Sequence, residues 1–197
     1  MNIVTLPPSS APPVERLLTI ADVAVLPSDL PTGDVKYELD DGRLVVMAPP
    51  GDMHASGQAL ILAALVVQGQ VPGHGVARGD VGVILRRNPD RLVGPDAVFI
   101  ANRSLPLRHS SEGYLEIIPD LVVEIRSKND TQPRIDRKVG EYLNAGVVVV
   151  WVLDPDTRTV TICRQGEQPQ RLSAEDTLKV PDLIPGFQVA VAALFDA

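Results

Sequence analysis

The chain has 197 residues, of which 45% are hydrophobic and 22% are charged, with a net charge of −7 at pH 7. This composition excludes a disordered chain and favours one globular domain with an aliphatic core, which we expect over residues 14–197 behind a loose tail at 1–13. The acidic balance argues against binding nucleic acid by bulk charge attraction, although a local basic groove is compatible with it.

The chain offers no pattern for a membrane helix or a disulfide framework. Its longest apolar run, at 59–67, has nine residues, against the ~20 that a bilayer-spanning helix requires. Cys163 is the single cysteine, and a small core residue is its most economical interpretation. The Pro- and Ser-rich start does not resemble a secretion signal. We therefore expect a cytoplasmic protein that does not enter a membrane.

Three helices are predicted before the tail of the chain. Residues 14–27 predict a short helix delimited by Thr19 or Asp22. A second helix is expected over 53–70, with Asp52 as its N-cap and much of its surface buried. The third is expected over 132–146, because Pro133 suits a first turn and Gly146 suits a C-terminal cap.

The remaining runs predict strands. Asp41-Gly42 lies between two strand-like runs, which indicates a tight hairpin. The unbroken apolar run at 147–155 predicts a central strand covered on both faces, and the tail predicts one more strand and a short helix. Further strands are expected over 75–87 with a bend at Gly79 or Gly82, and over 92–101, 118–127 and 157–165. The order of elements predicts an α/β sandwich with a mixed sheet flanked by helices.

Acidic residues recur where buried strands end. Side chains alternate across a strand, so Glu124 and Arg126 share one face, and Asp96 can reach the same edge of the sheet from the preceding strand. Glu38, just before the hairpin, is a third candidate. Two carboxylates ~4 Å apart repel by roughly 4 kcal/mol at an effective dielectric of about 20. Such a cluster needs a cation, and its oxygen ligands suit Mg²⁺ or Mn²⁺.

The third predicted helix adds a cation to this cluster. Ile135, Val139 and Tyr142 form its inward stripe, and Lys138 falls within that stripe. A lysine facing inward requires an anionic partner, and Glu124 lies on the strand that directly precedes the helix. Two interpretations stay open: a structural ion pair, or a functional lysine. His54 is interpreted as a polar residue at a helix start, and His74 and His109 receive no role.

Five segments in order resemble the Uma-two family of restriction endonucleases, within the PD-(D/E)XK nuclease-like group. They are "YELDDGRLVVMAPPGDMH", "GPDAVFI", "IPDLVVEIRS", "DRKVGEYLNAGVVVVWVLDP" and "LIPGF". The likeness covers residues 19–195, nearly the whole chain. The resemblance implies a restriction-endonuclease-like core with a mixed sheet and a metal held by acidic residues at a sheet edge.

Carried onto this sequence, the resemblance implies metal-binding acids at Asp96 and Glu124, with Glu38 as a third metal-binding acid that acts through water. The lysine that follows the second acid by two positions in the wider group is replaced here by Arg126. Lys138 resembles a relocated version of that lysine, and Arg126 could bind a substrate phosphate. The implied activity is hydrolysis of DNA phosphodiester bonds by a homodimer with Mg²⁺ or Mn²⁺. The alternative is a binding or assembly module that kept the nuclease fold and lost catalysis.

Overall fold

The computed structural model describes residues 16–27, 29–30, 33–47, 49–128 and 130–196, so the tail expected at 1–13 lies outside the described residues. The helices are α1 (Ile20–Ala24), α2 (Asp52–Leu65) and α3 (Gln132–Ala145), with a π-helical turn at Val66–Gln70 and 3₁₀ turns at Asn102–Ser104 and Val191–Leu194. The strands are β1 (Asp29–Leu30), β2 (Gly33–Asp34), β3 (Lys36–Asp40), β4 (Arg43–Met47), β5 (Gly75–Gly79), β6 (Val83–Arg86), β7 (Arg91–Val93), β8 (Ala97–Ala101), β9 (Leu121–Ile125), β10 (Val149–Asp154), β11 (Thr159–Cys163), β12 (Gln170–Leu172), β13 (Thr177–Lys179) and β14 (Gln188–Ala190).

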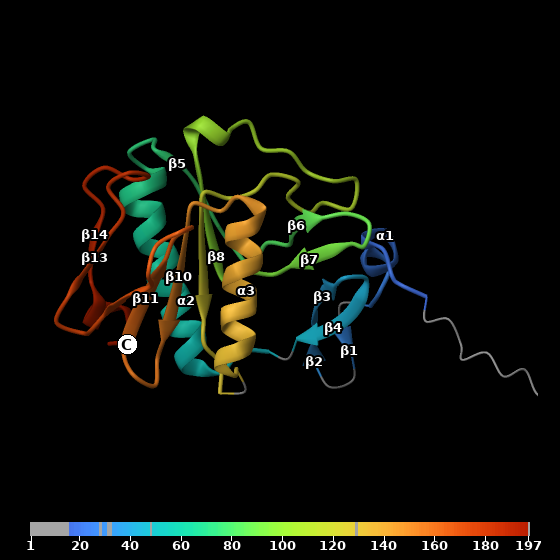
Figure 1. Ribbon diagram of the computed structural model, residues 1–197, viewed down its shortest axis with the longest axis horizontal. Helices are drawn as coiled ribbons and strands as arrows, with labels where there is room; N and C mark the ends of the chain where they lie inside the picture. The colour runs from blue at the N-terminus through green and yellow to red at the C-terminus, as the bar shows by residue number, and fades with distance from the viewer. Residues whose placement is uncertain (1–15, 28, 31–32, 48, 129, 197) are drawn as a thin grey trace, which may run out of the picture.

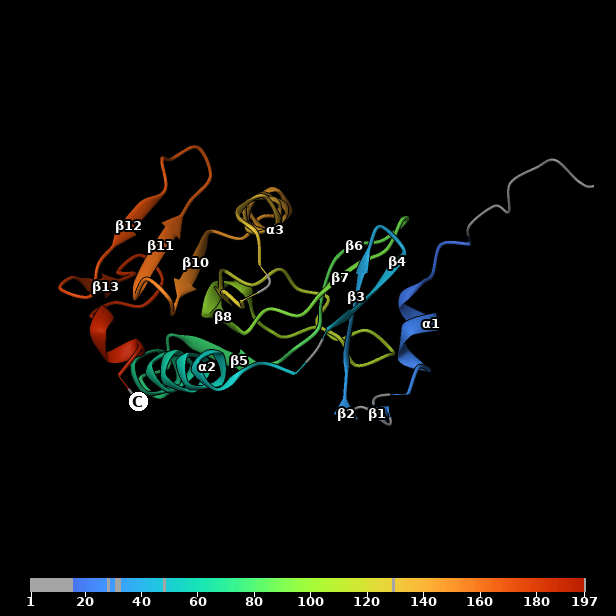
Figure 2. The same cartoon turned by 90° about the horizontal axis from the view of Figure 1, so that it is seen from below.

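The main sheet has six strands in the order β12-β11-β10-β9-β8-β5. Strands β9 and β10 are parallel, and the other neighbours are antiparallel. Figure 2 shows α2 and α3 on opposite faces of this sheet. The predicted mixed sheet flanked by helices is confirmed, and so is the central strand with both faces covered.

Alternation along the central strands divides the interior into two cores. One row of side chains, including Phe99, Val123 and Trp151, packs with Ile61 and Leu65 of α2. The opposite row, including Val98, Val122 and Val150, packs with Ile135 and Tyr142 of α3. Every residue of β8 and β9 is buried, Glu124 included. That glutamate therefore lies in the layer between the sheet and α3.

A second sheet of four strands, ordered β4-β3-β7-β6, lies beside the main sheet (Figures 1 and 2). Its β3–β4 hairpin turns at Asp41 and Gly42, both with positive φ (53° and 77°), as the sequence predicts. Helix α1 packs against this sheet around Leu39 and Leu92. Thr19 caps α1, and its side chain accepts a hydrogen bond from the Asp22 N–H.

Two predicted strands are each divided between the two sheets. The run at 75–87 forms β5 of the main sheet and β6 of the second sheet, and the run at 92–101 forms β7 and β8. The second break falls at Gly94-Pro95, where proline cannot donate to a strand ladder. The chain therefore passes from one sheet to the other immediately before Asp96, which fixes that acid at the junction.

Smaller differences concern the ends of elements. Gly51, not Asp52, is the N-cap of α2, and no side chain caps this helix. One strand was predicted in the tail, whereas the structure has two, β13 and β14, which pair with each other. Strand β12 was not predicted. No helix among the described residues is long and apolar enough to cross a membrane.

Candidate active site

Two acids lie near each other where β8 begins beside β9. The antiparallel register pairs Val98 with Val122 and Ala97 with Val123. Asp96 directly precedes β8, and its backbone N–H donates to the Val123 carbonyl at 3.1 Å. Oδ2 of Asp96 accepts from the backbone N–H of Ile125, the residue after Glu124. The structure therefore brings the two predicted acids to one edge of the sheet.

Lys138 reaches this edge from α3. Its Nζ lies 3.1 Å and 3.0 Å from the two carboxylate oxygens of Glu124, and 3.2 Å from Oε1 of Glu38. Its side chain is only 9% exposed. The residues of α3 that are fully buried are Ile135, Lys138 and Tyr142, which confirms the inward position of the lysine; Val139 is only partly buried.

Tyr142 holds Glu124 from the next turn of α3. Its hydroxyl donates a hydrogen bond of 2.5 Å to Oε1 of Glu124. Burial raises the pKa of the Tyr142 phenol well above its usual value, and the nearby Glu124 carboxylate raises it further. The phenol therefore stays protonated and acts as a fixed donor, so both Glu124 oxygens are oriented by α3.

The ionisation of Glu124 reflects competing neighbours. Burial is the largest influence and raises the pKa of its carboxyl; Lys138 opposes this, while the charges of Asp96 and Glu38 reinforce it. For Lys138, burial works to lower the pKa, but Glu124 and Glu38 outweigh it and leave the pKa above the usual lysine value. The lysine is therefore an ammonium ion at neutral pH, placed between two carboxylates.

Glu38 arrives from the second sheet. It lies on β3, is almost fully buried, and its Oε1 accepts hydrogen bonds from Lys138 and from the backbone N–H of Gly94 at 3.0 Å. The Gly94 contact ties it to the segment that leads into Asp96. The three predicted acids thus come from three separate chain segments, and Lys138 links two of them directly.

His54, in the first turn of α2, contacts Asp96. Its Nε2 lies 2.8 Å from Oδ1 of Asp96, and its Nδ1 lies 3.2 Å from the Ser127 hydroxyl. Oδ2 of Asp96 accepts a 2.6 Å hydrogen bond from the backbone N–H of Ile125. Burial works to lower the pKa of His54, but its contact with Asp96 and the charge of Glu124 raise it overall. The interpretation of His54 as a simple helix-start residue was therefore incomplete.

Arg126 lies at the opposite flank of α3 from Lys138. Its guanidinium donates to the Asp154 carboxylate at 3.1 Å and to the Gln132 side chain at 3.3 Å. It lines a pocket of about 550 Å³ between α3 and strands β10 and β11. A smaller pocket that includes Glu38 and Lys138 lies on the other flank of the helix. The contact of Arg126 with a substrate phosphate stays a prediction.

The donor set fits a hard divalent cation held by two carboxylates. Within the described ranges, no three His, Cys, Asp or Glu side chains form a group able to hold a metal ion. Mg²⁺ often uses just one or two carboxylates, completed by water and substrate phosphate. Asp96 and Glu124 could supply these. Burial raises the pKa of Glu124, and repulsion from the charges of Asp96 and Glu38 raises it further. A divalent cation would relieve that repulsion.

Comparisons with known proteins agree with this architecture. The family model described as "Uma2: Putative restriction endonuclease" matches residues 25–192. A solved structure of a "putative nuclease belonging to DUF820" from Anabaena variabilis ATCC 29413 has a TM-score of 0.73 and 18% sequence identity, covering 90% of this chain and 97% of that chain. No curated protein matches the chain.

At 18% identity the solved structure shows the shared fold alone, and it confirms the predicted restriction-endonuclease-like core. The family model spans most of the chain. The chain belongs to the Uma2 putative restriction endonuclease family.

Proposed function

We propose that this protein hydrolyses phosphodiester bonds in DNA with Mg²⁺ or Mn²⁺ held by Asp96 and Glu124. The observation that carries the proposal is the meeting of Asp96 with the end of β9, where its Oδ2 accepts from the Ile125 N–H at 2.6 Å, with the Lys138 ammonium 3.0 Å from Glu124. Family membership supports the reaction class. A divalent ion bound there would lower the pKa of a bound water and offset charge that develops on the phosphate.

The surrounding side chains would hold the two carboxylates in place. Tyr142 and Lys138 fix Glu124, while His54 and the Ile125 N–H fix Asp96. Both acids are thereby oriented before substrate arrives, which lowers the cost of reorganisation during the reaction. Glu38 would contact the ion through a water while its Oε1 stays bound to Lys138 and Gly94.

Lys138 would act through its charge. Its pKa is raised by Glu124 and Glu38 despite burial, so it does not lose a proton readily enough to serve as the general base near neutral pH. As an ammonium ion it can donate to the attacking water or to a phosphate oxygen. This role requires the positive charge of Lys138 and no transfer of its proton. Arginine at the same position would keep the charge but change the shape of the charged group.

A cleavage assay tests the proposal. Supercoiled plasmid is incubated with Mg²⁺ or Mn²⁺ and the wild-type protein, Asp96→Ala or Glu124→Ala, and circular dichroism confirms that each variant is folded. We expect the wild type to nick or linearise the plasmid and both variants to lose this activity. Cleavage that persists in both folded variants, purified identically, would show that other residues perform the chemistry.

The alternative, a nuclease-fold module without catalysis, has one specific observation in its favour. Both oxygens of Glu124 already receive hydrogen bonds from Lys138 or Tyr142, as they would in a structural ion pair. Calorimetric titration with Mn²⁺ separates the two functions. Binding that disappears in Asp96→Ala favours the nuclease, whereas no heat of binding at millimolar Mn²⁺ favours the module.

Three finer features belong to the same proposal. Arg126 would contact a substrate phosphate, and Arg126→Gln would then raise KM while leaving kcat unchanged. Two copies would pair so that each site addresses one DNA strand, which sedimentation equilibrium can measure. Action on DNA in the cytoplasm can be checked by fractionating cells that express the protein.

A further inference from the structure

A basic pocket opens beside the proposed catalytic site, between α3 and the β3–β4 hairpin. Its volume is about 290 Å³, and Glu38 and Lys138 contribute to its lining. Any group bound in this pocket would therefore lie directly next to the Lys138 ammonium. The pocket lies on the flank of α3 that faces the second sheet.

Arginines dominate this pocket, although the protein as a whole is acidic. Four cationic side chains line it (Arg91, Arg134, Arg137 and Lys138), against two carboxylates (Glu38 and Asp40). The whole chain has a net charge of −7, so the lining of this pocket differs in sign from the protein, although Glu124 and Glu141 pair with Lys138 and Arg91 from outside the lining. The acidic balance of the whole chain is thus compatible with a locally basic pocket lining.

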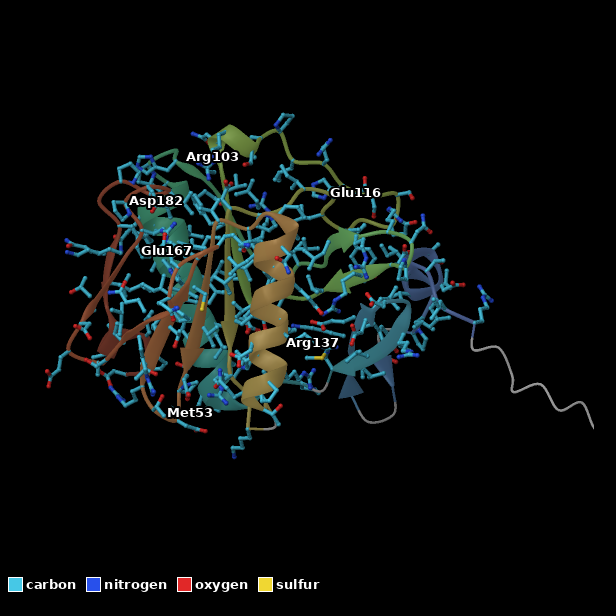
Figure 3. The ribbon with its side chains drawn as sticks, viewed as in Figure 1. Met53, Arg103, Glu116, Arg137, Glu167 and Asp182 are labelled. Carbon is cyan, nitrogen blue, oxygen red and sulfur yellow. The ribbon has the colours of Figure 1, made fainter. Side chains whose placement is uncertain are left out.

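The cations differ in how far they are neutralised. Arg91 is buried and paired with Glu141 at 2.5 Å and with the Leu39 carbonyl at 2.7 Å, so its role is to join the second sheet to α3. Arg137 is 54% exposed and bound to Asp40 at 2.9 Å. Figure 3 shows Arg137 projecting from α3 towards the hairpin.

Arg134 is the cation with the weakest contacts in this group. Its guanidinium lies 3.9 Å from Asp130 and 3.8 Å from the Met47 sulfur, and its side chain is 38% exposed. Arg134, Arg137 and Lys138 follow one another at i, i+3 and i+4, so they share one face of α3 within about one turn. Charge on this face therefore runs from the buried lysine to the exposed rim.

We propose that Arg134 and Arg137 bind the DNA backbone phosphate that neighbours the scissile one, and so position the strand over Lys138. This inference rests on the proposed nuclease function. Guanidinium groups bind phosphate through two parallel hydrogen bonds, and the exposed rim of the pocket admits a continuous polymer. Asp40 competes for Arg137, so the Arg137–Asp40 pair opposes binding and must open when phosphate enters.

Binding measurements without divalent metal test this independently of cleavage. A fluorescein-labelled 20-base-pair duplex is titrated in EDTA with the wild type, the double variant Arg134→Gln/Arg137→Gln, and Arg87→Gln as a control. Arg87 is a similarly exposed arginine with one carboxylate partner, Glu116, and Figure 3 shows Glu116 far from Arg137. Circular dichroism confirms folding of each variant.

We expect about an eightfold loss of affinity for each phosphate contact removed at 0.1 M salt, and a salt dependence whose slope falls by about 0.9 per contact. Asp40→Asn should bind the duplex more tightly than the wild type, a change that a purely structural role for Arg137 would not produce. Arg87→Gln should change affinity less than twofold.

The outcomes separate the two claims. If the double variant binds like Arg87→Gln while the wild type cleaves plasmid normally, the phosphate pocket is wrong and the nuclease stands. If the double variant binds weakly and raises KM with kcat unchanged, the pocket is supported. If the wild type neither binds the duplex nor cleaves plasmid, the nuclease proposal and the pocket that depends on it both fail.

Discussion

Removing the Lys138 charge should leave a buried carboxylate without its cation. In Lys138→Met the long apolar stem is kept, but the 3.0 Å and 3.2 Å contacts to Glu124 and Glu38 are lost. Breaking a buried ion pair by removing one partner typically costs about 3–5 kcal/mol. In this protein the cost can be smaller, because Glu124 can take up a proton and so lose its unpaired charge.

Protonation of Glu124 sets both the size and the pH dependence of the stability lost in Lys138→Met. Protonating a carboxyl with an ordinary pKa of 4.5 at pH 7 costs about 1.4 kcal/mol for each of roughly 2.5 pH units, a ceiling of about 3–4 kcal/mol. Burial already raises the pKa of Glu124 beside Lys138, so we expect the loss at pH 7 to lie below this ceiling but above the effect of an exposed ion pair.

The sign follows from linkage. In the variant, the folded-state pKa of Glu124 rises further above its unfolded value. A group of this kind stabilises the fold at low pH and loses that contribution as pH rises through the folded pKa. The loss caused by Lys138→Met should therefore shrink as pH falls from 7 to 5.

Urea unfolding followed by fluorescence measures this directly, since the single tryptophan, Trp151, is fully buried. The control is Lys36→Met, which removes an exposed lysine paired with Asp80 and should change the free energy of unfolding by less than about 1 kcal/mol. If Lys138→Met lowers the free energy of unfolding no more than this control does, or if the loss does not vary with pH, Lys138 does not stabilise the fold by compensating the buried Glu124 carboxylate.

Three further predictions concern single groups. Tyr142→Phe removes the hydroxyl that donates to Glu124 and keeps the ring, so urea unfolding should show a loss of about 1.5–3 kcal/mol; a loss below about 0.5 kcal/mol, the usual scatter of surface substitutions, would contradict the contact. His54→Gln removes a partner of Asp96 and should weaken Mn²⁺-dependent cleavage by about 10–100-fold without unfolding the protein; an unchanged Mn²⁺ dependence would deny His54 that role. Gly146→Ala places a Cβ at φ 108° where α3 ends and should cost about 1 kcal/mol in thermal unfolding; an unchanged melting temperature would show that the cap is not strained.

The acids and the lysine could be predicted because each follows a local periodicity. Strand alternation places Glu124 on one face, and helical spacing places Lys138 on the inward stripe of α3. The two residues are 14 positions apart, across a single strand-to-helix connection, so the shortest closure brings them together. Asp96 required one further assumption, that its strand pairs with the strand of Glu124.

The second sheet and His54 could not be predicted in the same way. The run at 92–101 has the composition of one strand, and only Gly94-Pro95 signals that it belongs to two sheets. His54 and Asp96 are 42 residues apart, and no periodicity relates a helix start to a distant strand junction. Such contacts depend on how α2 packs on the sheet, which is a tertiary property.

The basic pocket depends on tertiary structure for the same reason. Helical spacing alone puts Arg134, Arg137 and Lys138 on neighbouring positions of α3. Their common environment requires the hairpin of the second sheet, which supplies Glu38 and Asp40 from about 100 residues earlier in the chain. The sequence alone therefore predicts that the three cations are neighbours on α3, but it does not predict that Glu38 and Asp40 lie beside them.

A crystal structure of the protein soaked in Mn²⁺ would show whether Asp96 and Glu124 hold one metal ion between them. Anomalous scattering locates the ion without reference to activity. We expect a manganese peak within coordination distance of both Asp96 and Glu124, absent in Asp96→Ala. Saturating Mn²⁺ that leaves this position empty, or that binds elsewhere while the protein still cleaves DNA, would contradict the proposed metal site.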